Sequence, residues 1–157
     1  MGEKSIGNHG RVTLVGFGPG DPDLLTIKGY KSLEHADVIF YDDLTNESFL
    51  SQFEADKVYV GKRNGRHSHD QSEINELLYQ SAALGNDVVR LKGGDPMLFS
   101  HGREEVDFLR KRGVDVDVVP GVSSGNALAS LLQIPLTHRG VARSVAMVLG
   151  HSDKLQH

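Results

Sequence analysis

Two glycines, an aspartate and a proline, Gly93-Gly94-Asp95-Pro96, follow one residue after the mainly apolar run 88–91. Glycine has no Cβ atom, so a ligand can approach the main chain closely, and it accepts positive φ. Asp95 adds a carboxylate acceptor, and Pro96 restricts the backbone of the residue before it. Loops after parallel strands are common ligand sites in open α/β folds. This loop therefore predicts a site for a ligand carrying hydroxyls, amines or positive charge; a tight strand-to-helix turn without a ligand is the alternative.

Basic residues gather in two stretches that contain no acid, residues 58–69 and 118–152. The chain of 157 residues has a net charge of -4, which argues against nucleic-acid binding by overall electrostatics. Local basic segments in an acidic protein suggest a pocket for a small polyanion, and two solvated loops are the alternative. The cations and histidines concerned are Lys62, Arg63, Arg66, His67 and His69, then His138, Arg139, Arg143 and His151.

The glycines Gly16, Gly18 and Gly20 follow the first apolar run and invite comparison with dinucleotide-binding loops. Asp42 stands where the ribose-binding acid of such a site would be. Two details oppose this interpretation. The spacing is GxGxGD instead of GxGxxG, and Pro19 has no amide to offer a pyrophosphate. We therefore do not expect nicotinamide or flavin binding.

Other motifs for metal binding or nucleophilic catalysis are weak. His67-x-His69-Asp70 lacks the helical spacing of the zincin pattern, and the chain has no cysteine. Ser123 and Ser124 do not lie in a GxSxG motif; we expect Ser124 to cap the next helix and Ser123 to hydrogen-bond a ligand. No apolar run approaches the roughly 20 residues of a membrane span, and no leader pattern opens the chain. These features fit a cytoplasmic protein without a membrane partner.

The remaining pattern places these residues on alternating strands and helices. Apolar, β-branched runs predict strands, and a recurrence near 3.6 residues predicts helices. Asp70 followed by Glu73 predicts a capping box, and Gly85 ends that helix. The alternation predicts an α/β fold with a five-stranded parallel, doubly wound sheet and helices on both faces. The expected strands are residues 11–15, 38–41, 57–60, 88–91 and 116–119, and the expected helices are residues 24–33, 47–53, 71–84, 104–111 and 124–132.

A sixth apolar run, residues 145–149, stands apart from this alternation. It predicts a strand with few residues after it to cover it, so we expect it to be the first strand of a second, truncated α/β domain. Such a strand could also pair with a second copy of the chain. On this interpretation the chain divides into a flexible tail at 1–10, an N-terminal domain at 11–133, a linker at 134–144 and the start of a C-terminal domain at 145–157.

Six sequence blocks occur in a fixed order between Arg11 and His151. They are VTLVGFGPGDPDLLTIK, ADVIFYDDL, GKR followed by HSHDQSEIN, VVRLKGGDP, VVPGVSS and IPLTHRGVARSV. Together they resemble the tetrapyrrole methylase family. The HSxxQxEIN and PLTHR blocks are most similar to the branch of that family that methylates uroporphyrinogen III.

The resemblance implies S-adenosylmethionine as methyl donor, bound in a folded conformation between two α/β domains, with no metal. It also implies a homodimer. It implies transfer of two methyl groups to ring carbons of uroporphyrinogen III, which gives precorrin-2 on the way to sirohaem or cobalamin. Asp42 and Lys62 match the family's proposed proton acceptor and proton donor. The donor site carried over by motif comprises Pro19, Gly93, Gly94, Asp95, Leu98, Ser123 and Ser124. The candidate contacts to substrate carboxylates are Arg63, Arg66, His67, Lys92, Arg139 and Arg143.

Two positions depart from the family pattern. Residues 100–105 read SHGREE where the family is nearer GRGGEE, which leaves the role of Arg103 open, and Ser123 replaces a usual threonine. Donor contacts from the second domain are expected to be missing, so we expect weak donor binding and low turnover. Two alternatives remain: a related methylase acting on a later corrin precursor, and a nucleotide-binding α/β domain without catalysis.

Overall fold

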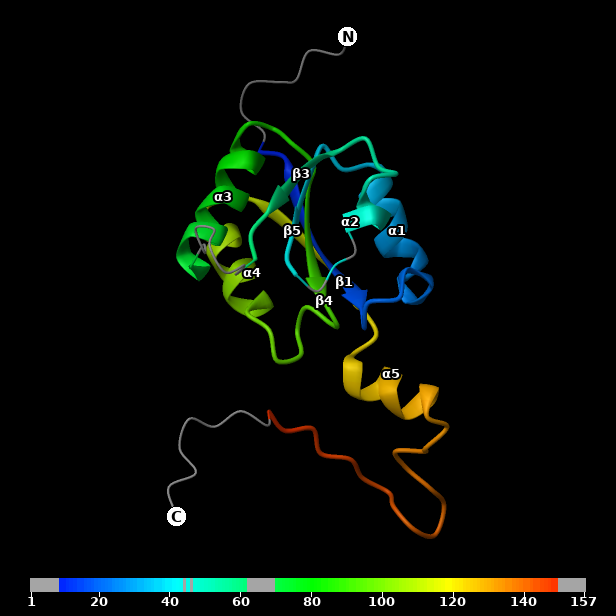
Figure 1. Cartoon of the computed structure of the whole chain (residues 1–157). Helices are drawn as coiled ribbons and strands as arrows, with labels where there is room; N and C mark the ends of the chain where they lie inside the picture. Colours follow the sequence, from blue (N-terminus) through cyan, green and yellow to red (C-terminus); the bar gives the residue numbers. More distant parts are fainter. Residues whose placement is uncertain (1–8, 44, 46, 62–69, 150–157) are drawn as a thin grey trace.

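A computed structural model describes residues 9–43, 45, 47–61 and 70–149 of the chain. Its centre is a five-stranded, all-parallel sheet with strand order β3-β2-β4-β1-β5 (Figure 1). The predicted fold class is confirmed. The strands are β1 (Arg11–Gly18), β2 (Val38–Tyr41), β3 (Asp56–Tyr59), β4 (Val88–Gly93) and β5 (Asp115–Val119), and the helices are the 3-10 turn η1 (Pro22–Leu24), α1 (Ile27–Glu34), α2 (Glu47–Leu50), α3 (Gln71–Ala83), α4 (Gly102–Arg110) and α5 (Ser124–Leu131).

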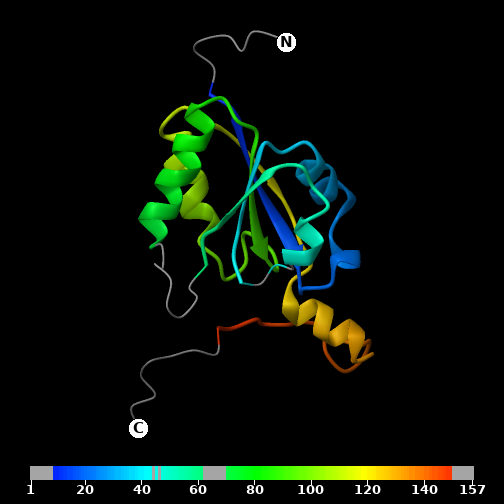
Figure 2. The same ribbon diagram turned by 45° about the horizontal axis from the view of Figure 1, so that its top comes forward.

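The connections between strands run over both faces of the sheet. The chain passes through α1 and α2 on one face, and through α3 and α4 on the other (Figures 1 and 2). β4 lies between β2 and β1. The helix after β4, α4, covers one face of the sheet, whereas the helices after β1 and β2, α1 and α2, cover the other face. The loop after β4 therefore diverges from the loops after both neighbours. In parallel sheets this divergence leaves a crevice at the carboxyl edge, where ligands bind.

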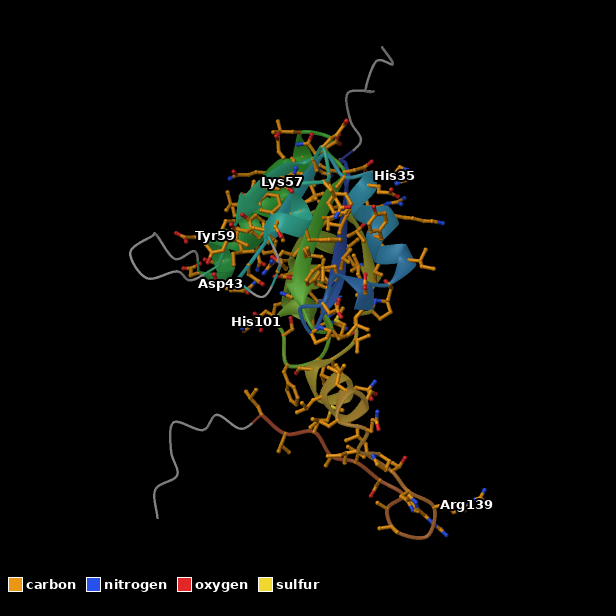
Figure 3. All side chains as sticks on the ribbon, turned by 45° about the vertical axis from the view of Figure 1, so that its right-hand side comes forward. His35, Asp43, Lys57, Tyr59, His101 and Arg139 are labelled. Carbon is orange, nitrogen blue, oxygen red and sulfur yellow. The ribbon has the colours of Figure 1, made fainter. Side chains whose placement is uncertain are left out.

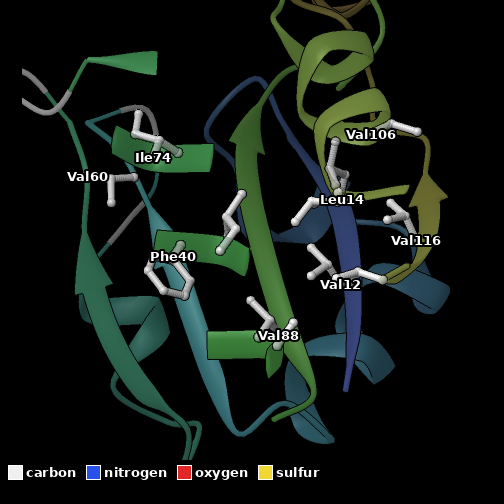
Figure 4. Packing of buried hydrophobic residues seen from close by; sticks show 12 residues of the cluster. Val12, Leu14, Phe40, Val60, Ile74, Val88, Val106 and Val116 are labelled. Atoms are coloured by element: carbon white, nitrogen blue, oxygen red, sulfur yellow. The ribbon is translucent and has the colours of Figure 1, made fainter. Parts of the chain in front are cut away.

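Each face of the sheet has its own apolar core, because neighbouring strand residues point to opposite faces. Leu14 of β1 faces α3 and α4, whereas Val15 faces α1 and α2. The first core contains Val12, Leu14, Phe40, Val60, Ile74, Leu78, Ala82, Val88, Val106, Leu109, Val114 and Val116 (Figure 4). The second contains Val15, Phe17, Leu33, Ile39, Leu50, Phe53, Ala55, Val89, Leu91 and Val119. Burial on both faces explains why the inner strands β2 and β4 read as mainly apolar runs, whereas the edge strands β3 and β5 carry charged residues.

The start of α3 follows the predicted capping box. The Asp70 carboxylate accepts a hydrogen bond from the Glu73 amide at 2.8 Å, and the Glu73 carboxylate accepts one from the Asp70 amide at 3.0 Å. Two amides of the first turn are thereby satisfied. Gly85 follows the helix with φ +84, a left-handed conformation that glycine adopts without strain.

Two expectations about the second half of the chain are wrong. Residues 145–149 do not form a strand; within the described residues they pair with no strand of the sheet, and Val148 is 81% exposed. An apolar run becomes a strand only where a neighbour accepts its ladder of hydrogen bonds, and α5 turns the chain away from the sheet before this run begins (Figure 1). Ser123, not Ser124, is the N-cap of α5, and its side chain makes no capping hydrogen bond. None of the described helices combines the length and apolarity needed to cross a membrane.

We expect Asp117→Asn to destabilise the chain slightly and only above acidic pH. Lys28 of α1 donates to the Asp117 carboxylate of β5 at 2.7 Å, and this bond lowers the pKa of Asp117 below 3.8. A carboxyl group with a lowered folded-state pKa contributes stability above its unfolded pKa, and the contribution disappears as pH falls through the lowered value. Both side chains are largely exposed, so the loss near neutral pH should be about 0.2–1 kcal/mol. Urea unfolding of the wild type and Asp117→Asn at pH 7 and well below pH 3.8 would measure this loss of stability. An equal loss at both pH values would show that the ion pair is not the cause.

Candidate functional site

A cavity of about 680 Å³ lies at the carboxyl edge of the sheet. The loops after β1 and β4 form one side of it, the start of α5 adds a second, and residues 146–149 add a third. It therefore occupies the place where the β4 loop diverges from the β1 loop. All residues predicted to bind the donor line this one cavity: Pro19, Gly93, Gly94, Asp95, Leu98, Ser123 and Ser124.

Three glycine backbones pack against each other beside the cavity. An added Cβ on Gly121 would lie 2.2 Å from the Gly94 carbonyl oxygen, and one on Gly16 would lie 2.5 Å from the Gly121 nitrogen. Gly18 and Gly94 exchange two backbone hydrogen bonds, of 2.8 and 3.2 Å. The end of β1 and the GGDP loop after β4 are thus joined by main-chain hydrogen bonds. The Gly16-x-Gly18 pattern serves this close approach of main chains.

Asp95 ties the β4 loop to the β5–α5 connection. Its Oδ1 accepts from the Met97 amide at 2.8 Å, and its Oδ2 accepts from the Gly121 amide at 3.0 Å. The carboxylate is half-buried and lines the cavity. Because an ionised carboxylate has about four lone-pair sites, these two bonds orient Asp95 and leave acceptor capacity for a ligand.

Asp42 follows β2 on the other side of β4 and is ion-paired with a buried arginine. Its Oδ2 lies 3.2 Å from Nη2 of Arg90, whose side chain is 5% exposed, and the Asp42 side chain itself is 24% exposed. Arg90 also donates to the Leu91 carbonyl at 2.8 Å. The guanidinium therefore holds the Asp42 carboxylate in a defined position at the edge of the sheet.

Glu105 of α4 is a fully buried carboxylate next to Arg90. Its Oε1 accepts from Lys92 and from Gln71, both at 3.0 Å, and lies 3.5 Å from Nε of Arg90. Oε2 of Glu105 and Nε of Arg90 have no hydrogen-bond partner within the described part of the chain. Burial lowers the pKa of Lys92, and the attraction of Glu105 offsets part of this. The expectation that Lys92 contacts a substrate carboxylate does not fit this position, because its ammonium is buried against Glu105.

Neither Arg139 nor Arg143 lines the cavity. Arg139 lies in a turn closed by the bridge between His138 and Ala142, at the far end of the molecule from Asp43 and His101 (Figure 3). Arg143 follows the same turn. Arg103 points outward and pairs with Asp107 at 2.7 Å, which gives it a surface role. The remaining expected residues, Lys62, Arg63, Arg66 and His67, lie outside the described residues.

Sequence reasoning missed the importance of Arg90 and Glu105. The available signal was a cation inside an otherwise apolar strand and an acid beside Val106 on the buried side of α4. Buried charges are rare unless they are paired, so each of these residues required a partner that the sequence did not identify.

The fold and the cavity define a class of protein, the open α/β proteins that bind a small molecule at a topological switch point. Residues 11–157 match the family described as Tetrapyrrole (Corrin/Porphyrin) Methylases. The chain belongs to this family, as the six sequence blocks predicted.

Relatives and solved structures agree with this membership. The chain is 49% identical over 144 residues to a uroporphyrinogen-III C-methyltransferase of Methanocaldococcus jannaschii, covering 90% of this chain and 60% of that protein. A Thermus thermophilus uroporphyrin-III C-methyl transferase complexed with S-adenyl homocysteine is 52% identical, with a TM-score of 0.71, covering 86% of this chain and 53% of that one. A cobalt precorrin-4 methyltransferase is 34% identical, with a TM-score of 0.71, covering 82% and 52%. The chain thus spans between half and 60% of the length of these proteins.

Proposed function

We propose that this chain binds S-adenosylmethionine in the cavity and serves the C-methylation of uroporphyrinogen III to precorrin-2, a step toward sirohaem or cobalamin. The observation that carries the proposal is the convergence of every predicted donor-site residue on one cavity at the switch point of the sheet. The names of the relatives support the choice of substrate, because identity is 49% to a uroporphyrinogen-III enzyme and 34% to the precorrin-4 enzyme.

The residues of the cavity fit a nucleoside that carries an amino acid and a sulfonium. A Cβ on Gly94 would meet nothing within 4 Å, so the glycine leaves space at the cavity wall. Asp95 contributes a fixed negative charge, which suits the positive sulfonium and the amino group. The Ser123 hydroxyl is not used as a helix cap and can hydrogen-bond a ligand.

The residues beside the cavity fit the proton transfer that C-methylation requires. The donor supplies an electrophilic methyl group on sulfur. When a ring carbon takes up this methyl group, the ring system must lose a proton, and Asp42 is the carboxylate that we assign to accept it. Arg90 orients Asp42 through the 3.2 Å ion pair. We assign Lys62 as proton donor from the resemblance alone.

Positioning is the largest contribution that the protein can make to such a methyl transfer, because the carbon, the methyl group and the sulfur must lie in line. The backbone-to-backbone packing of Gly16, Gly94 and Gly121 supplies the rigidity that this requires. We retain Arg63, Arg66 and His67 as candidate contacts to the substrate carboxylates, together with Arg139 and Arg143, which would need to be brought nearer to the cavity.

The proposal extends to the organisation of the protein. Residues 11–133 would form the donor-binding domain, 134–144 a linker and 145–157 part of a second unit, in a cytoplasmic homodimer. Support for the first domain is that β1 to α5 fall within it; the linker, the dimer and the location rest on the family resemblance.

Calorimetric titration with S-adenosylhomocysteine tests the proposed donor site. The chain should bind S-adenosylhomocysteine and not NAD, and Asp95→Ala should weaken binding at least about tenfold, because it removes a charged acceptor worth about 1.5–3 kcal/mol. Asp21→Ala is the matched control, since Asp21 accepts a comparable turn hydrogen bond from the Asp23 amide but does not line the cavity. Binding of NAD, or equal affinity of the Asp95→Ala variant, would favour the nucleotide-binding alternative. Comparing methylation of uroporphyrinogen III and precorrin-2 would separate the two methylase candidates.

A further inference from the structure

Phe99 is an aromatic residue whose position the fold itself does not explain. Its side chain is 56% exposed, and it lines the cavity next to Leu98. None of the ring contacts found among the described residues involves Phe99, whereas Phe17, Phe49 and Phe53 all pack against other rings. An exposed ring at a cavity wall therefore gains little from folding and is available to a ligand.

The backbone at Phe99 is also strained. Its φ is +51, and among the described residues only Gln133 shares a positive φ without being glycine. A bulky L-residue in the left-handed region costs roughly 1–2 kcal/mol relative to ordinary backbone. Such strain collects at functional sites, where the surrounding structure enforces it.

The enforcing contacts come from Asp95. The Met97 amide donates to the Asp95 carboxylate at 2.8 Å, and the Leu98 amide donates to the Asp95 carbonyl at 3.3 Å. Beyond the strained residue, Gly102 begins α4 so close to the Pro96 carbonyl oxygen that a Cβ would lie 2.0 Å from it. The turn is therefore closed on both sides of Phe99, and the ring is held at the cavity wall by main-chain geometry.

We propose that Phe99 is the aromatic surface on which the purine base of the nucleoside ligand stacks. This inference rests on the proposed function, which supplies the nucleoside. A flat heteroaromatic group is the ligand chemistry that best fits an exposed ring, because base–aromatic stacking needs a π-face and no hydrogen-bond partner. The polar groups at Asp95 and Ser123 then remain for the amino-acid and ribose parts of the ligand.

Calorimetry with S-adenosylhomocysteine on four proteins tests the assignment: wild type, Phe99→Ala, Phe99→Tyr and Met97→Ala. Stacking of one base is worth about 1–3 kcal/mol, so Phe99→Ala should weaken binding about tenfold and Phe99→Tyr should retain it. Met97→Ala is the matched control, since Met97 is a neighbouring exposed apolar residue of the same loop that does not line the cavity. Adenosine should compete with S-adenosylhomocysteine more weakly against Phe99→Ala than against the wild type, and homocysteine should compete equally with both.

A second variant distinguishes a ligand contact from a structural residue. Phe99→Gly removes the ring and relieves the strain, so its midpoint of urea unfolding should equal or exceed that of the wild type while its affinity falls as in Phe99→Ala. A merely structural ring would lose stability and affinity together.

The outcomes separate this inference from the proposed function. Wild-type protein that fails to bind S-adenosylhomocysteine would remove both. Wild-type binding with unchanged affinity in Phe99→Ala would remove only the role of Phe99. If Phe99→Ala kept its affinity for S-adenosylhomocysteine but bound uroporphyrin more weakly than the wild type, the purine assignment would be overturned in favour of a contact with a pyrrole ring.

Discussion

Replacing Gly121 by alanine is expected to destabilise the chain by about 3 kcal/mol, at the upper end of the usual effect of overpacking. The new Cβ would lie 2.2 Å from the Gly94 carbonyl oxygen and 2.7 Å from Cα of Gly16. Both neighbours are main-chain atoms, which cannot move aside as a flexible side chain would. Relief of the overlap must separate the β5–α5 connection from the GGDP loop, so the hydrogen bond from the Gly121 amide to Asp95 is lost as well. We therefore expect the variant also to lose measurable binding of S-adenosylhomocysteine.

Urea unfolding and calorimetry on the same preparations would measure both effects of Gly121→Ala. Gly125→Ala is the matched stability control, because a Cβ there would meet only the Met147 side chain at an ordinary 3.8 Å. Gly125 lies within α5, where alanine is favoured over glycine by roughly 0.5–1 kcal/mol. We expect that variant to be as stable as the wild type or more so. Equal stability of Gly121→Ala and the wild type would contradict the close backbone packing.

Replacing Glu105 by alanine is expected to cost about 3–5 kcal/mol in the free energy of unfolding, the usual effect of removing one partner from a buried charge cluster. Glu105 is fully buried and lies 3.0 Å from Lys92 Nζ and 3.5 Å from Arg90 Nε. Its loss leaves both cations in the interior, with Asp42 paired to Arg90 at 3.2 Å. We also expect the orientation of Asp42 to become less defined.

The loss of stability in Glu105→Ala should become smaller as the pH rises. Burial already lowers the pKa of Lys92 from 10.5, and removing the attraction of Glu105 lowers it further. Between the lowered folded-state pKa of Lys92 and 10.5, the unfolded state binds more protons at this residue than the folded state does, so the free energy of unfolding increases with pH across that window. Denaturant titrations at pH 7 and near pH 10 would show the trend, which should be steeper in the variant than in the wild type.

The adjacent acid provides the control for the buried cluster. Glu104 is largely exposed and pairs with His101 at 3.2 Å, so Glu104→Ala should change stability by less than about 0.5 kcal/mol. A similar small effect in Glu105→Ala would show that the buried charges are not coupled as the structure indicates.

Local signals in the sequence were sufficient for the elements of the first half of the fold. The strand at Val38–Tyr41 was predicted to the residue, and the capping box at Asp70 and Glu73 was predicted with its partners. Both depend on interactions within a few residues. The predicted strand at residues 145–149 was wrong because strand formation depends on a neighbour in the fold, which an apolar run cannot specify.

The lining of the cavity was predictable as a set of residues, but the contacts among these residues were not. Motif resemblance named the residues that line the cavity, including Pro19 and Asp95. It gave no indication that both Asp95 oxygens accept backbone amides, or that Lys92 is buried against Glu105 rather than directed to a substrate. The Lys92–Glu105 contact joins residues 13 positions apart and the Gly121–Asp95 contact joins residues 26 positions apart, so these two exist only once the strands are in order.

The sequence by itself determined where the five strands of the sheet, the capping box of α3 and the turn at Gly85 lie, because apolar periodicity, capping side chains and glycine act over short distances. The tertiary structure alone decided that β4 stands between β2 and β1, and hence that its loop diverges from theirs to leave a cavity. It also decided that Gly16, Gly94 and Gly121 meet main chain to main chain. The physical reason is that strand order and close approach depend on which apolar faces are buried together over the whole chain, and no local pattern records that choice.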